Sequence, residues 1–93
     1  MLPTGSIIGI LGGGQLGRML AIPAAQLGYQ VHIYAPDAES VAADVSAHHT
    51  QAAWDDEQRL AAFASHCDVV TLEFENVPVD TINFLSGHVA VHP

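Results

Sequence analysis

Short apolar runs alternate with stretches in which apolar residues recur every three or four positions. The runs at 7–11, 29–35, 68–74 and 89–92 have the length and composition of strands. Residues 47–53 give a weaker strand signal, supported by little beyond Thr50. The first run is apolar at nearly every position, as a central parallel strand covered on both faces should be. This alternation predicts βαβ units and a parallel sheet of about five strands.

Three helices are predicted between these strands. Gly28 ends the first, and Pro23 should kink it because proline removes a backbone hydrogen bond. Its apolar stripe consists of Leu16, Met19, Leu20 and Leu27. The second begins at Asp55, with Gln58 three positions on as a variant of the capping box. Its apolar side consists of Leu60, Phe63 and Ala64.

The third predicted helix runs from Pro78 to Leu85 and is closed by Gly87. Trp54 should pack where the preceding strand meets the second helix. Cys67 should be a small buried residue and not a nucleophile.

The segment LGGGQLGRM, at 11–19, lies between the first predicted strand and helix. Gly12, Gly14 and Gly17 match the G-x-G-x-x-G spacing of a phosphate-binding turn. The first glycine permits the turn, the second lets a phosphate approach the backbone, and the third lets helix and strand pack closely. The helix N-terminus then offers free N–H groups to an anion. A tight turn without a ligand is the alternative interpretation.

Asp37 lies 20 residues after Gly17, where a dinucleotide-binding domain carries an acid for the ribose 2′-hydroxyl. Pro36 precedes it, so Asp37 is expected in the loop beyond the strand, and a solvated turn residue is the alternative. The glycine loop by itself does not distinguish NAD from another phosphate compound.

A second polar signal is TLEFENVP, at 71–78. In an extended chain Glu73 and Glu75 share one face and Phe74 takes the other. Two unpaired carboxylates are costly to bury, so they are expected at the carboxyl end of the strand, where open α/β sheets bind ligands. Asn76 is suited to cap the following helix or turn. A solvated strand end is the alternative.

The charge balance restricts the partners. Ten acidic residues face two arginines and no lysine, which gives a formal net charge of −8. This argues against nucleic acid and against an ATP phosphate site within these residues. No apolar stretch approaches the ~20 residues of a membrane span. The lack of a signal peptide and the single cysteine predict a cytoplasmic protein.

No metal site is predicted. His48 and His49 would point to opposite faces of a strand, and no H-x-x-x-H or cysteine partner supports zinc. The six histidines are therefore interpreted as surface or strand-end residues. The acidic run at 55–57 is explained as favourable charge at a helix N-terminus.

Together, ILGGGQLGRM and VVTLEFENVP resemble the N-terminal domain of the N5-carboxyaminoimidazole ribonucleotide synthases, the ATPase subunits of phosphoribosylaminoimidazole carboxylase. The resemblance covers residues 1–93, including PDAES at 36–40. It implies one pre-ATP-grasp domain, a Rossmann-like three-layer α/β/α fold. Family members continue for a few hundred residues, through an ATP-grasp and a C-terminal domain. Residues 1–93 are thus expected to be the N-terminal part of a longer enzyme.

The resemblance also implies an activity. These ligases use ATP and bicarbonate to carboxylate 5-aminoimidazole ribonucleotide in de novo purine (IMP) biosynthesis, with Mg²⁺ on the nucleotide. The ATP and Mg²⁺ sites would lie outside this fragment, so no catalytic residue and no turnover are expected of it alone. A cytoplasmic homodimer is implied for the full-length enzyme.

Carried over onto matching positions, the resemblance implies a set of substrate-binding residues. Backbone N–H groups of 14–16 and the Gln15 amide would meet the phosphoribosyl side, and Glu73 would accept from a ribose hydroxyl or the aminoimidazole. Arg18 is not assigned to the phosphate. The full set is Gly12, Gly13, Gly14, Gln15, Leu16, Gly17, Glu73, Glu75 and Asn76, with Asp37 as a possible ribose contact.

Three alternatives stay open. One is the NAD-binding Rossmann domain of an oxidoreductase or nucleotide sensor, which Asp37 supports but which leaves Glu73 and Glu75 unexplained. Another is a scaffold domain without a ligand. The third is a formate-dependent glycinamide ribonucleotide transformylase, which tends to carry glutamate where this chain has Gln15, and which lacks the EFENVP string.

Overall fold

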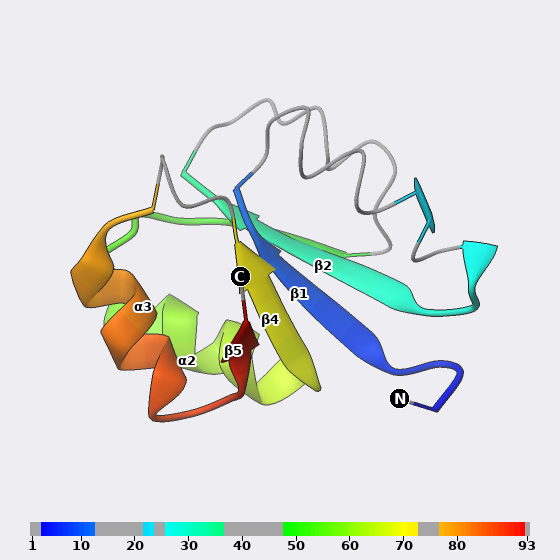
Figure 1. The fold of residues 1–93 in the computed structure, drawn as a ribbon. Coiled ribbons are helices and arrows are strands. Elements are labelled where there is room, and N and C mark those ends of the chain that lie inside the picture. Colours follow the sequence, from blue (N-terminus) through cyan, green and yellow to red (C-terminus); the bar gives the residue numbers. More distant parts are fainter. Residues whose placement is uncertain (1–2, 13–21, 24–25, 37–47, 73–76, 93) are drawn as a thin grey trace.

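Five parallel strands form one sheet in the computed structural model, which describes residues 3–12, 22–23, 26–36, 48–72 and 77–92 (Figure 1). The strands are β1 (Ile7–Leu11), β2 (Gln30–Ala35), β3 (His48–Gln51), β4 (Val69–Leu72) and β5 (Val91–His92). Their order is β3-β2-β1-β4-β5, so the chain starts at the centre of the sheet and adds strands on both sides. This is the strand order of a Rossmann sheet, as predicted.

All five predicted strands are present, and the two at the edges of the sheet are shorter than predicted. The central β1 has the predicted bounds, and β2 starts one residue later than predicted. The edge strands β3 and β5 contain four and two residues. An edge strand is paired on one side only, so fewer hydrogen bonds hold its ends, which explains why the predicted edge strands were too long.

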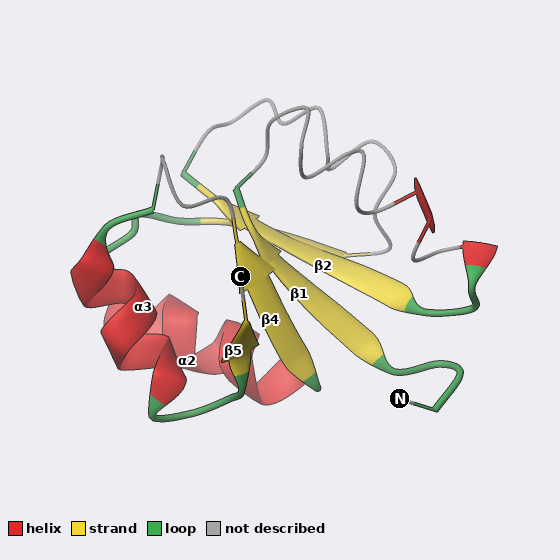
Figure 2. Ribbon diagram, in the orientation of Figure 1, coloured by secondary structure: helices red, strands yellow, loops and turns green. Residues whose placement is uncertain are grey.

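Two described helices, α2 (Glu57–His66) and α3 (Val79–Ser86), cover the same face of the sheet (Figure 2). The predicted apolar side of α2 is confirmed, since Leu60, Phe63 and Ala64 are buried. The predicted end of α3 is also confirmed, because Gly87 is its C-cap.

The predicted capping pair of α2 was wrong by one residue. Asp56, not Asp55, is the N-cap, and its Oδ1 accepts a hydrogen bond of 3.1 Å from the Arg59 amide. The Asp56 amide donates to the Ala53 carbonyl oxygen across a tight turn. Asp55 therefore lies inside that turn, and Asp56 is the first side chain that reaches the free N–H groups of the helix.

Most of the first predicted helix, including Leu16, Met19 and Leu20, lies outside the described residues. Gly28 has φ +88° and ends this segment as predicted. Leu27 was predicted to be on the buried stripe, and this was wrong, because its side chain is 70% exposed. It lies in the turn before Gly28, where the chain reverses toward β2.

A glycine lets α2 approach the centre of the sheet. A Cβ atom added to Gly9 in β1 would lie 2.7 Å from both Cys67 Sγ and Phe63 Cζ. These distances are too short for real Cβ contacts, so only glycine allows this packing. The core on this side also contains Tyr34 of β2 and Leu85 of α3, both fully buried.

Candidate functional site

Neighbouring strands end side by side at the carboxyl edge of the sheet. Leu11, the last residue of β1, pairs with Tyr34 on one side and with Leu72, the last residue of β4, on the other. The glycine loop and the acidic segment, predicted from distant parts of the sequence, therefore begin at adjacent positions. In open α/β sheets this edge is where ligands bind.

Gly12 is the one predicted site residue within the described ranges, and its conformation agrees with its predicted turn role. Its φ is +115°, a conformation that side-chain-bearing residues rarely adopt, and its amide donates a 2.9 Å hydrogen bond to the Tyr34 carbonyl oxygen. The remaining predicted site residues lie outside the described residues: Gly13, Gly14, Gln15, Leu16, Gly17, Asp37, Glu73, Glu75 and Asn76.

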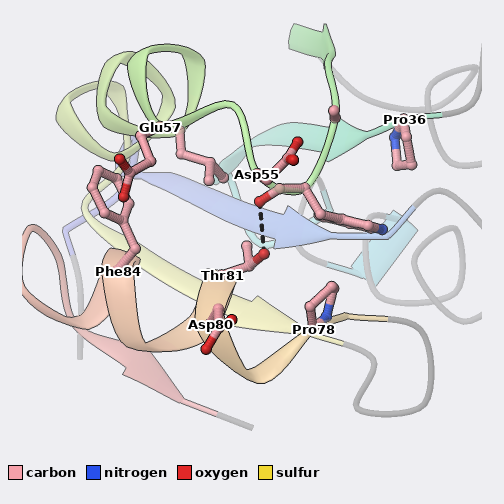
Figure 3. Close-up of a pocket in the computed structure, with 10 residues that line it drawn as sticks. Pro36, Asp55, Glu57, Pro78, Asp80, Thr81 and Phe84 are labelled. Carbon is pink, nitrogen blue, oxygen red and sulfur yellow. Dashed lines mark hydrogen bonds between the residues drawn. The ribbon is translucent and has the colours of Figure 1, made fainter.

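A cavity of about 560 Å³ opens near the same edge, between the turn before α2 and the first turns of α3 (Figure 3). Its apolar lining includes Pro36, Trp54 and Phe84. Thr81 Oγ1 of α3 donates a 2.7 Å hydrogen bond to the Trp54 carbonyl oxygen, which joins the two walls. This cavity was not predicted from the sequence. The one available signal was an aromatic residue placed directly before an acidic run at 54–57.

Tyr34 is hydrogen-bonded to the turn that forms one wall of this cavity. Its hydroxyl donates to the Ala53 carbonyl oxygen at 2.5 Å, and its ring lies 5.7 Å from the Trp54 ring, centroid to centroid. Burial, with a smaller contribution from the negative charge of Asp56, raises the Tyr34 pKa to about 12. The phenol therefore stays protonated and acts as a structural donor. The expectation that Trp54 packs between strand and helix is confirmed.

One histidine does not fit the interpretation of surface or strand-end residues. His32 lies within β2 and is 8% exposed, so that interpretation was wrong for this residue. Its Nδ1 lies 2.8 Å from His66 Nδ1, and its Nε2 lies 2.6 Å from Thr50 Oγ1. The partners explain why a polar ring is tolerated there. The missed signal was a polar residue in the apolar run VHIYA.

Burial, together with the neighbouring His66, His48 and His49, lowers the His32 pKa to about 4. The His48 ring also lies close to the His66 ring, with centroids 4.6 Å apart. Within the described ranges, however, no group of three His, Cys, Asp or Glu side chains is arranged to hold a metal ion.

Cys67 is buried, as predicted. Burial, with a smaller contribution from Asp68, raises the pKa of its thiol to about 12. A thiol with so high a pKa is a poor nucleophile at neutral pH.

A parallel sheet in this strand order, with a left-handed glycine turn after its central strand, defines a Rossmann-like α/β domain. Residues 6–93 match the family described as the ribonucleotide synthetase preATP-grasp domain. The chain belongs to this family. In the described part of the chain, no helix has the length and apolarity needed to cross a membrane.

Relatives support this assignment. The chain is 50% identical to the N5-carboxyaminoimidazole ribonucleotide synthase of Brucella melitensis over 99% of this chain and 25% of that protein. It is also 50% identical to the bifunctional purine synthesis protein purC/E of Dictyostelium discoideum, over 100% of this chain and 9% of the relative. The chain therefore spans at most about a quarter of these proteins.

Solved structures show the same domain. The N5-carboxyaminoimidazole ribonucleotide synthetase of Thermus thermophilus superposes with a TM-score of 0.86 at 43% identity, over 92% of this chain and 24% of that one. The Aspergillus clavatus synthase, in complex with ADP and 5-aminoimidazole ribonucleotide, superposes with a TM-score of 0.80 at 36% identity. The match covers 97% of this chain and 24% of that one.

Proposed function

We propose that the chain is the substrate-binding N-terminal domain of an N5-carboxyaminoimidazole ribonucleotide synthase. The observation that carries this proposal is the 50% identity to the Brucella enzyme over 99% of the chain. Identity this high over a whole domain supports a shared role in the enzyme as well as a shared fold. The relatives are ribonucleotide synthases, so the NAD-binding and scaffold alternatives are not favoured.

In the proposed reaction ATP phosphorylates bicarbonate, and the resulting carboxyphosphate supplies the carboxyl group to the amine of 5-aminoimidazole ribonucleotide. The products are the N5-carboxylated ribonucleotide, ADP and phosphate. ATP and Mg²⁺ would bind outside these residues, in agreement with a chain that has two arginines and no lysine. The complete enzyme is proposed to be a cytoplasmic homodimer.

This domain would bind the ribonucleotide at the carboxyl edge of the sheet. The backbone turn at Gly12, with φ +115°, supports a loop that brings amide groups toward a phosphate. The residues proposed to contact substrate are Gly12, Gly13, Gly14, Gln15, Leu16, Gly17, Glu73, Glu75 and Asn76, with Asp37 near the ribose. Glu73 would accept a hydrogen bond from a ribose hydroxyl or from the aminoimidazole.

A domain exchange tests the proposal. The matching quarter of the Brucella enzyme is replaced by this chain, and ADP formation is measured with and without 5-aminoimidazole ribonucleotide. We expect ribonucleotide-dependent ADP formation, which Glu73→Gln should reduce by about 10-fold or more because the hydrogen bond to the substrate loses its charged acceptor. A folded chimera that binds ATP but shows no ribonucleotide-dependent turnover would contradict the proposal. The isolated chain should form no ADP.

A further inference from the structure

The cavity beside Trp54, here called the Trp54 pocket, has the size of a small-molecule site. Its volume of about 560 Å³ falls within the range of roughly 300–1,000 Å³ typical of ligand pockets. Trp54, in the turn before α2, and Phe84, in α3, supply aromatic surface to the pocket. Leu60 of α2 adds aliphatic surface.

The polar side chains around this apolar surface are nearly all hydrogen-bond acceptors. Asp55, Glu57 and Asp80 line the pocket, and all three are labelled in Figure 3. Thr81 lines it too, but its hydroxyl hydrogen is donated to the Trp54 carbonyl oxygen, so only lone pairs remain for a ligand. Among the described lining residues none is Lys, Arg or His, and the indole N–H of Trp54 is the single side-chain donor.

These features select the charge and the form of a ligand. Three carboxylates with no cationic partner among the described lining residues favour a positively charged donor and disfavour phosphates. In the described part of the chain, no three acidic or imidazole groups are arranged to hold one metal ion, so a compact inorganic cation is a poor fit. An organic cation can pair its charge with one of these carboxylates while its ring lies against Trp54 and Phe84, with a cation–π contribution.

We propose that the Trp54 pocket binds a small organic cation, an ammonium or amidinium group attached to a flat apolar ring. This site differs in charge preference from the proposed ribonucleotide site, because a phosphate-bearing substrate would be repelled by the three carboxylates. The inference therefore stands or fails separately from the proposed function.

Trp54 is the single tryptophan of the chain, so its fluorescence reports on the pocket directly. The probes are 2-phenylethylammonium, 2-phenylethanol and phenylacetate, which share a ring and differ in charge. We expect saturable quenching by the ammonium compound, with an affinity about 5- to 10-fold higher than that of the alcohol, from ion pairing and cation–π contact. Phenylacetate should bind more weakly than the alcohol.

Substitutions locate the site. Glu57→Gln and Asp80→Asn should each weaken binding of the ammonium probe by about three- to fivefold, as expected for a partly exposed ion pair. Asp68→Asn is the matched control, since it removes the same charge from a residue outside the pocket lining. Circular dichroism checks that each variant is folded. Equal binding of alcohol and ammonium, equal effects of the control and pocket variants, or no quenching by the ammonium probe would each overturn the proposal.

Discussion

His32 and His66 join β2 to the end of α2 through their Nδ1 atoms, which lie 2.8 Å apart. At this distance one ring must donate an N–H and the other must accept with a bare nitrogen. The pair is therefore compatible with at most one added proton. His32, with its pKa lowered to about 4, is the ring that resists protonation in the folded protein.

This relationship predicts a loss of stability in mild acid. The folded-state pKa of His32 lies below its unfolded value of 6.5, so the unfolded chain binds more protons between these values. The contribution of His32 to folding stability is complete above pH 6.5 and is lost progressively as the pH falls toward 4, with a loss of roughly 2 kcal/mol between pH 6.5 and 5. Urea unfolding between pH 7.5 and 5 measures it.

Two variants separate His32 from the other titrating groups. His32→Gln should flatten the pH dependence over this range, whereas His88→Gln, at an exposed position near the end of α3, should leave it unchanged. Identical pH slopes for His32→Gln and the unmodified chain would contradict the assignment.

Gly9→Ala should destabilise the protein by about 1–3 kcal/mol, the usual cost of overpacking a core. The new methyl would lie 2.7 Å from both Cys67 Sγ and Phe63 Cζ. Gly87→Ala is the matched control, because the nearest heavy atom to its added Cβ lies 3.6 Å away and its φ is −80°. Chemical denaturation of both variants gives the comparison, and equal stability losses would show that α2 does not depend on Gly9.

Asp56→Ala should cost about 1 kcal/mol, because it removes the side chain that accepts from the Arg59 amide at the start of α2. Asp56→Asn should retain most of that stability, since asparagine is also a good N-cap. Asp55→Ala should have a smaller effect, because Asp55 is not the cap. If thermal unfolding showed a larger loss of stability for Asp55→Ala than for Asp56→Ala, the assignment of Asp56 as the N-cap would be contradicted.

Cys67 should be protected from thiol reagents in the folded state. Its pKa of about 12, against an ordinary value of 9.0, makes the thiolate scarce at pH 8, and burial restricts access. The rate of reaction with a chromogenic disulfide should rise by about 100-fold or more in denaturing urea. Fast modification without denaturant, together with an unchanged circular dichroism spectrum, would contradict burial of this thiol.

The sequence predicted best what depends on local pattern. β1 has its predicted bounds because a central strand is apolar on both faces, and the buried side of α2 follows from its helical spacing. The His32 contacts were missed because Thr50 and His66 reach this ring only through strand register and helix packing. The Trp54 pocket was missed for the same reason, since Pro36 and Phe84 meet across elements distant in sequence.

The candidate site could be predicted in part. The spacing of the glycines indicated a turn, and Gly12 has the conformation that such a turn requires. Strand register was not predictable from pattern, yet it is what brings Leu11 and Leu72 to the same edge.

The start of β1 is tied to the start of β4 by two hydrogen bonds. The Ile7 amide donates to Asp68 Oδ2 at 2.7 Å, and the Asp68 amide donates to the Ile7 carbonyl oxygen at 2.8 Å. A nascent or proteolysed chain that stops before Asp68 would leave one side of the isoleucine-rich β1 without its β4 partner. Such an open apolar strand edge recruits other chains. Truncated products of this protein are therefore expected to aggregate, and a chain that includes β4 is the shortest that covers its own central strand.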